Sequence, residues 1–257
     1  MLSNSFIHVP TIGAQTERLL WENKIMCWDD FLSSNSELPI SNQKKKKISS
    51  HIKKSQTRLK KKDITFFKNY FPPSEMWRIY PEFKDSACFL DIETTGLSPD
   101  YHDVTVVGLF DGKKSKAYIN GKNLGKLEKA LDRFDLLVTF NGACFDLPFL
   151  NSSMGIQFHQ AHIDLRFVLS RLGHTGGLKK IERQLGIGRE TAGTTGLDAV
   201  YLWKAYKQNK WYKCNGIDYR GKSALDLLIK YNQEDIENLK TLMEYGYEKL
   251  KKEVMRK

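Results

Sequence analysis

The fold of this chain is decided by the stretch Ala87-Cys88-Phe89-Leu90-Asp91-Ile92-Glu93-Thr94-Thr95-Gly96-Leu97. Its apolar run predicts a buried strand, which the Thr-Thr-Gly that follows brings to an end. Successive side chains of a strand point to opposite faces, so Asp91 and Glu93 share one face. Two neighbouring carboxylates at the edge of a core repel each other unless a positive charge lies between them. Because hard cations such as Mg²⁺ prefer carboxylate oxygens, the stretch predicts a metal site.

The residues downstream alternate between strand and helix patterns. The sequence pattern predicts two more strands, at residues 104–110 and 116–120. Between them, Asp111-Gly112 is a dipeptide typical of the turn of a β-hairpin. Residues 124–134 predict a helix, and residues 136–140 predict a fourth strand that is buried on both faces. Three strands in a meander, followed by helices and further strands, indicate an α/β fold in which helices flank a mixed sheet.

Two further acidic motifs follow this pattern. Asp146 stands where a loop turns into a helix, since Pro148 suits the first helical turn. The ordinary role of an aspartate at such a position is to cap the helix. Tyr231 and Asp235 lie in a predicted C-terminal helix and, being four residues apart, share one helix face.

The three motifs, in this order, resemble those of the DEDD exonuclease superfamily. That superfamily has a ribonuclease-H-like fold and includes the proofreading domains of DNA polymerases. The stretch 91–97 is similar to its first motif, and Asn-x-x-x-Phe-Asp-x-Pro at 141–148 resembles its second. Tyr-x-x-x-Asp at 231–235 has the form of the tyrosine (DEDDy) subtype.

Within this superfamily the chain looks most like the stand-alone YprB-like branch, and the resemblance covers residues 86–242. The segments that carry it are Trp-Arg-x-Tyr-Pro at 77–81, Gly-Gly-Leu-Lys at 176–179 and Gly-Leu-Asp-Ala-Val at 196–200. The glycines at 176–177 open a helix. The turn they form either holds a backbone phosphate or is only a loop and cap.

The resemblance implies hydrolysis of phosphodiester bonds from a 3′ end by two divalent ions, Mg²⁺ or Mn²⁺. Four carboxylates would hold the ions: Asp91, Glu93, Asp146 and Asp235. Tyr231 would orient the attacking water, because a phenol with a pKa of ~10 is a poor base. The expected substrate-binding residues are Thr94, Leu97, Asn141 and Lys179.

Composition bounds the class of protein. Of the 257 residues, 40% are hydrophobic, which is ordinary for a globular domain. No apolar run approaches the ~18 residues needed to span a bilayer, and the N-terminus lacks the pattern of a signal peptide. The four cysteines form no paired motif, which argues against a zinc site or a disulfide framework. We therefore expect a cytoplasmic protein with reduced thiols.

The charge is unevenly distributed. The net charge is +11, and residues 41–63 contain ten Lys or Arg against one acid. This balance indicates nucleic acid, single-stranded DNA or RNA, as the partner. The basic segment predicts a helix with a thin apolar stripe. It is open whether that helix binds nucleic acid, forms a nuclear-localisation-like run or is simply a solvated face.

We expect three parts: a helical N-terminal element at 1–40, a basic helical linker at 41–80 and a ribonuclease-H-like exonuclease domain at 81–257. The segment around Gly13 is similar to one helix-hairpin-helix unit, and a small helical cap is the alternative.

The predicted function is a metal-dependent 3′–5′ exonuclease acting on single-stranded nucleic acid, with DNA favoured over RNA. One alternative is an RNA-processing exonuclease or a structure-specific endonuclease. Another is a catalytically idle nucleic-acid-binding module, against which the intact acids argue.

Overall fold

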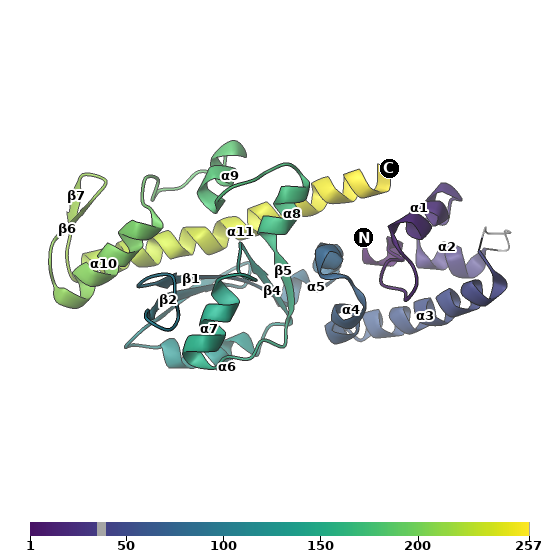
Figure 1. Cartoon of the computed structure of the whole chain (residues 1–257), viewed down its shortest axis with the longest axis horizontal. Coiled ribbons are helices and arrows are strands. Elements are labelled where there is room, and N and C mark those ends of the chain that lie inside the picture. Colours follow the sequence, from purple (N-terminus) through teal and green to yellow (C-terminus); the bar gives the residue numbers. More distant parts are fainter. Residues whose placement is uncertain (35–39, 257) are drawn as a thin grey trace.

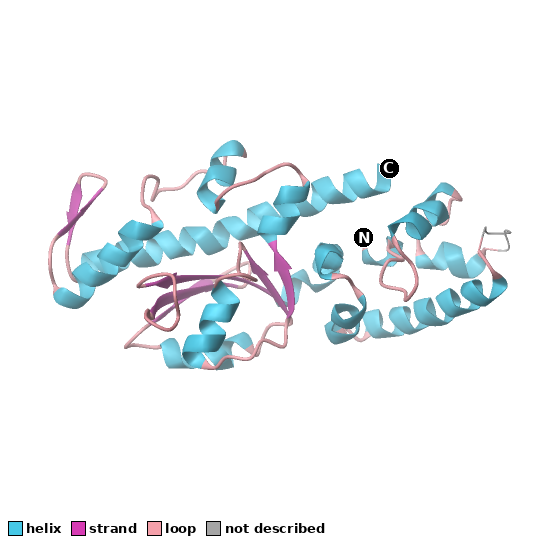
Figure 2. Cartoon of the chain, in the orientation of Figure 1, coloured by secondary structure: helices cyan, strands magenta, loops and turns pink. Residues whose placement is uncertain are grey.

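A computed structural model describes residues 1–34 and 40–256 of the chain, and its centre is a five-stranded mixed sheet (Figures 1 and 2). The strand order is β3-β2-β1-β4-β5. Strand β2 is antiparallel to β1 and β3, while β4 runs parallel to β1 and β5. The strands are β1 (Ala87–Thr94), β2 (Val104–Phe110), β3 (Ser115–Ile119), β4 (Leu136–Thr139) and β5 (Ala161–Asp164). A separate hairpin consists of β6 (Tyr212–Cys214) and β7 (Ile217–Tyr219). The mixed sheet flanked by helices confirms the predicted fold class.

Helices surround this sheet and also form the N-terminal region (Figure 2). The α-helices are α1 (Ala14–Glu22), α2 (Trp28–Ser33), α3 (Asn42–Lys60), α4 (Ile64–Tyr70), α5 (Tyr80–Phe83), α6 (Leu127–Leu131), α7 (Asp146–Met154), α8 (Leu165–Arg171), α9 (Leu178–Gln184), α10 (Gly196–Gln208) and α11 (Lys222–Arg256). The 3₁₀ helices are η1 (Leu2–Asn4), η2 (Pro73–Ile79), η3 (Lys84–Ser86) and η4 (Leu124–Lys126). Among the described residues, no helix is both long and apolar enough to cross a membrane.

The alternation of side chains along β1 decides which helix meets which face. Cys88, Leu90 and Ile92 belong to a hydrophobic cluster with residues of α6 and α7. Phe89 belongs instead to the cluster that contains the apolar residues of α11. Because the side-chain period of a strand is two, Asp91 and Glu93 lie on the same face as Phe89. The acids of β1 therefore face α11.

Helix α11 crosses that face of the sheet. It contacts β1, β2, β3 and β4, and Figure 1 shows it along one side of the sheet with α6 and α7 on the other. Its apolar residues recur at helical spacing, and Ile236, Leu239 and Met243 are fully buried. This packing brings the third acidic motif over the first.

Some boundaries differ from those that the sequence predicts. The helix expected at 124–134 is shorter: η4 is a 3₁₀ turn, and α6 ends at Leu131. Gly125 has a low helix propensity, which accounts for the irregular start. The β6–β7 hairpin and α10 lie in a segment for which no elements were predicted.

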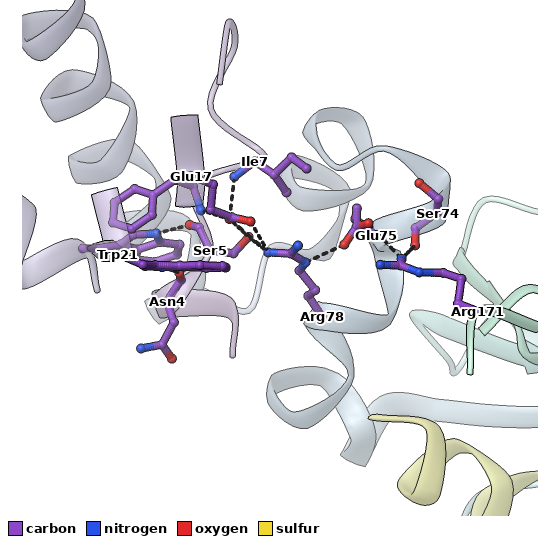
Figure 3. Close-up of polar contacts among 11 residues, drawn as sticks. Asn4, Ser5, Ile7, Glu17, Trp21, Ser74, Glu75, Arg78 and Arg171 are labelled. Carbon is purple, nitrogen blue, oxygen red and sulfur yellow. Dashed lines mark hydrogen bonds and ion pairs between the residues drawn. The ribbon is translucent and has the colours of Figure 1, made fainter. Parts of the chain in front are cut away.

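The N-terminal helices pack on the sheet domain through a series of charged contacts that are buried around Arg78 (Figure 3). Glu17 of α1 accepts hydrogen bonds from the backbone N–H of Phe6 and Ile7, and it forms an ion pair with Arg78 at 2.8 Å. Arg78 Nε also donates to Glu75, which in turn accepts from Arg171 of α8. The buried hydrophobic core is likewise continuous from the N-terminal region to α11.

The turn at Gly13 differs from that of a helix-hairpin-helix unit. Gly13 is the N-cap of α1, and before it the chain forms only the three-residue η1 and irregular turns. A pair of α-helices therefore does not flank this turn.

The basic segment forms a helix as predicted. Ile48 and Ile52 provide the buried stripe of α3, while Lys46, Lys47 and Lys53 are among its exposed cations.

Candidate metal centre

Three carboxylates of the acidic motifs converge between β1 and α11. One oxygen from each of Asp91, Glu93 and Asp235 lies within 4.8 Å of the others. Glu93 and Asp235 are buried, and Asp91 is partly buried. The i, i+2 spacing on the strand aligns the first two acids, and the crossing of α11 supplies the third.

Asp146 lies beside this group, at the start of α7. Its Oδ1 accepts a hydrogen bond of 3.1 Å from the backbone N–H of Ile92, which lies between the two acids of β1. Asp146 is the first residue of α7, and Phe145 occupies the N-cap position, so the alternative that Asp146 is the N-cap does not apply. Its carboxylate interacts both with the neighbouring strand, at Ile92, and with its own backbone N–H.

Burial makes these carboxylates hard to ionise. It raises the pKa of Asp146 to about 7, and it also raises the pKa of Asp235. For Asp91 and Glu93, burial and the nearby charge of Asp235 hold the pKa well above its usual value. Four desolvated carboxylates in one place form an oxygen-only donor set that suits hard divalent cations, so these residues fit a metal centre.

Two basic side chains reach into the same site. Lys179 Nζ lies 2.5 Å from the Tyr231 hydroxyl and 3.5 Å from Asp235 Oδ1. Arg189 forms an ion pair with Asp235 and a two-point contact with Glu182, at 2.5 and 2.6 Å. These cations offset part of the negative charge and fix the position of the Asp235 carboxylate.

Tyr231 is buried one helical turn before Asp235. Burial, followed by the charges of Glu93, Asp235 and Asp91, raises the pKa of its phenol far above the usual value. The side chain therefore stays protonated at neutral pH. Because its oxygen accepts a hydrogen bond from Lys179, its own proton is directed elsewhere.

Asn232 links the helix to the strand. Its Nδ2 donates a hydrogen bond of 2.9 Å to Asp91 Oδ2. Gly108 pairs with Asp91 across the β1–β2 ladder, and a Cβ at this position would lie 2.2 Å from Asn232 Oδ1. Glycine is therefore required in β2 because the amide of Asn232 occupies the space above it.

All nine candidate residues that the sequence predicts line one cavity of about 280 Å³. The expected substrate-binding residues lie at its wall and mouth. Thr94 Oγ1 donates to the carbonyl of Gly96, Leu97 is 83% exposed, and the amide oxygen of Asn141 accepts from Arg166. Asn141 therefore supports the wall without touching the acids.

Sequence reasoning missed Arg189, Glu182 and Asn232. A glycine inside the apolar strand 104–110 is a signal of close approach by another group, and it pointed to the place that Asn232 occupies. No comparable pattern marks Arg189, which follows a glycine turn and reaches the site only through the tertiary fold.

The mixed sheet, with carboxylates from its first strand and from the long helix that covers it, defines a ribonuclease-H-like nuclease fold. A family model described as the RNase_H superfamily matches residues 88–247, which is more than half of the chain. The chain belongs to the RNase_H superfamily.

Solved structures with a similar fold include Brucella melitensis NrnC bound to pGG. It is 19% identical, the match covers 68% of this chain and 80% of that one, and the TM-score is 0.43. The family B DNA polymerase of the hyperthermophilic archaeon Pyrobaculum calidifontis is 14% identical. Here the match covers 62% of this chain and 24% of the polymerase, with a TM-score of 0.47. No curated protein matches the chain.

Proposed function

We propose that this protein is a metal-dependent 3′–5′ exonuclease of the DEDDy type, of the YprB-like branch, that hydrolyses single-stranded nucleic acid. The observation that carries the proposal is the meeting of Asp91, Glu93 and Asp235 within 4.8 Å, in a cavity that Asp146 and Tyr231 also line. DNA is the favoured substrate, and RNA is the alternative that the experiment below decides.

The four acids would hold two divalent ions, Mg²⁺ or Mn²⁺. When bound, such ions activate water and stabilise the charge that develops on a leaving oxygen. The carboxylates are already held in place without the ions: Asn232 binds Asp91, the backbone of Ile92 binds Asp146, and Arg189 binds Asp235. Such preorganisation lowers the cost of assembling the site.

Tyr231 would position the attacking water by donating its hydroxyl proton as a hydrogen bond. A base role does not suit it, because the raised pKa of its phenol keeps the proton on the oxygen. Lys179 would hold the phenol oxygen in place and would add positive charge beside the scissile phosphate. Thr94, Leu97 and Asn141 would contact the terminal nucleotide from the rim.

Degradation of 5′-labelled single-stranded DNA and RNA tests the proposal. With Mg²⁺ or Mn²⁺ we expect a ladder that shortens from the 3′ end. The ladder should disappear with EDTA and in Asp91→Ala, in which rates should fall by roughly 10³-fold or more. Asp226→Ala, which removes an exposed acid of the same helix α11, is the matched control and should keep full activity.

The products distinguish the alternatives. Internal fragments would indicate an endonuclease, and faster degradation of RNA would indicate an RNA-processing enzyme. Binding without metal-dependent cleavage of either substrate would reject the exonuclease.

A further inference from the structure

A strip of exposed apolar side chains leads away from the catalytic cavity along α10. Gly196 and Val200 of this helix line the cavity. Their neighbours Leu197 and Tyr201 are 64% and 41% exposed, and they share one helix face because they are four residues apart. Large apolar side chains that gather on a surface mark an interaction site.

Aromatic rings continue the strip onto the β6–β7 hairpin. The ring of Tyr201 stacks on that of Tyr212 in β6, with the ring centroids 5.3 Å apart. The Tyr212 hydroxyl donates to Asp198 of α10, which ties the hairpin to the helix. Trp211, the preceding residue, is 67% exposed, and the guanidinium of Arg220 lies 5.5 Å from its ring.

The same segment is strongly basic. Residues 204–222 contain six basic residues and one acid, and all six basic side chains are exposed: Lys204, Lys207, Lys210, Lys213, Arg220 and Lys222. The ammonium of Lys204 lies 5.3 Å from the ring of Tyr201. An apolar strip alone would suit a protein partner. Dense positive charge among the rings complements a polyanion that also carries flat apolar groups.

We propose that this strip, α10 with the β6–β7 hairpin, binds the single-stranded nucleic acid that extends from the catalytic cavity. Bases stack on Tyr201 and Trp211, and phosphates contact the surrounding lysines. A duplex hides its base faces, so the strip selects single strands. The proposal rests on the proposed function, because it takes the cavity as the place where the strand ends.

Binding in EDTA tests the strip separately from cleavage. The probes are a fluorescein-labelled oligothymidine and a duplex of equal length, and fluorescence anisotropy is measured at several salt concentrations. We expect the wild type to prefer the single strand and Trp211→Ala to bind it roughly 10-fold or more weakly. Trp211→Phe should retain most of the affinity, and Lys210→Gln with Lys213→Gln should reduce the salt slope.

Tyr70→Ala is the matched control, since Tyr70 is an exposed aromatic residue of the N-terminal region, and it should bind as the wild type does. Equal affinity of Trp211→Ala and the wild type would overturn the proposal, whether or not the enzyme cleaves. So would self-association of the wild type that Trp211→Ala abolishes without a change in DNA binding, because the strip would then join two copies of the chain. Trp211-dependent binding without cleavage would support the strip and reject only the exonuclease.

Discussion

At the scale of the residue, the acidic cavity between β1 and α11 concentrates negative charge where water is largely excluded. Burial raises the pKa of Asp91, Glu93, Asp146 and Asp235, while the cations Lys179 and Arg189 both contact Asp235. The metal-free fold therefore carries an electrostatic cost that bound cations would remove.

This electrostatic cost makes the stability of the metal-free protein depend on pH. The pKa of Asp146 is about 7 in the folded chain, above its ordinary value of 3.8, so the unfolded chain loses this proton first as the pH rises. The free energy of unfolding of the metal-free protein should therefore fall between these two pH values. We expect Mg²⁺ to raise the melting temperature more at about pH 8 than at about pH 6, as measured by differential scanning fluorimetry.

Asp146→Asn is the control for this measurement. Without metal it should be more stable than the wild type above about pH 7, and it should respond less to Mg²⁺. Equal Mg²⁺ shifts at both pH values would contradict the expectation.

A second residue-scale prediction concerns Gly108. Gly108→Ala places a Cβ against Asn232 Oδ1, so it should cost about 1–3 kcal/mol of stability and reduce metal-dependent cleavage by displacing the partner of Asp91. In an Asn232→Ala background the further loss should be small, because the clashing atom is gone. Urea unfolding and cleavage assays of the wild type, the two single variants and the double variant check this prediction.

Gly125→Ala serves as the matched glycine control, because nothing lies within 4 Å of the added Cβ. An undiminished cost of Gly108→Ala in the Asn232→Ala background would show that the clash is with another group.

At the scale of the element, the N-terminal helices meet around one buried histidine. The ring of His8 stacks on Phe71 at 5.2 Å, contacts Trp28 of α2 at 5.3 Å, and lies 3.0 Å through Nε2 from Ser55 Oγ of α3. Burial, then the neighbouring His51 and Arg78, lowers the pKa of His8 to about 3. The packing of these helices therefore depends on a neutral imidazole.

The N-terminal region should accordingly be acid-sensitive. Because the folded pKa is about 3 and the ordinary value is 6.5, the unfolded chain takes up the proton first as the pH falls. The contribution of neutral His8 to the free energy of unfolding is therefore complete above about pH 6.5. It decreases below that pH, by about 1–2 kcal/mol at about pH 5. Urea unfolding followed by near-ultraviolet circular dichroism measures this loss.

His8→Gln should be less stable at neutral pH but should lose less stability on acidification. The interpretation fails if the wild type and this variant show the same pH slope between about pH 7 and about pH 5.

At the scale of the whole molecule, a series of ion pairs and a continuous hydrophobic core join the N-terminal helices to the sheet domain, and basic surfaces lie at opposite ends. Arg78 pairs with Glu17 on one side and with Glu75 on the other (Figure 3). Helix α3 and the β6–β7 hairpin occupy the two ends of the long axis (Figure 1). A long strand could therefore contact the protein well beyond the cavity.

Arg78→Ala should lower the free energy of unfolding by about 3–5 kcal/mol, because it leaves the buried carboxylate of Glu17 without its charge partner. Limited proteolysis should then cut the N-terminal region faster than the sheet domain. Pairing the change with Glu17→Gln should recover part of the loss, since no buried charge remains unpaired.

The matched control is Arg58→Ala, which breaks an ion pair with Asp63 that is partly exposed. It should cost at most about 1 kcal/mol. Similar costs for the two arginine variants would contradict a structural role for burial of the Arg78 pairs.

Much of this architecture could be predicted from local patterns. The strand at 87–94 and the same-face placement of Asp91 and Glu93 follow from a period of two. The shared face of Tyr231 and Asp235 follows from a period of 3.6. These periodicities are properties of neighbouring residues, so the sequence by itself determined the sheet class and the shared faces of the acids. The nine predicted site residues, which are among those that line the cavity, follow from the resemblance of the three motifs to those of the DEDD superfamily.

Only the tertiary structure decided what surrounds those residues. The contact of Asn232 with Asp91 spans 141 positions, and that of Arg189 with Asp235 spans 46. The burial of Glu17 beside Arg78, the bond from Ile92 to Asp146 and the alignment of Tyr201 with Tyr212 likewise join segments that no local pattern relates. Such contacts arise from how helices cross the sheet, because packing, and not periodicity, selects which distant side chains meet.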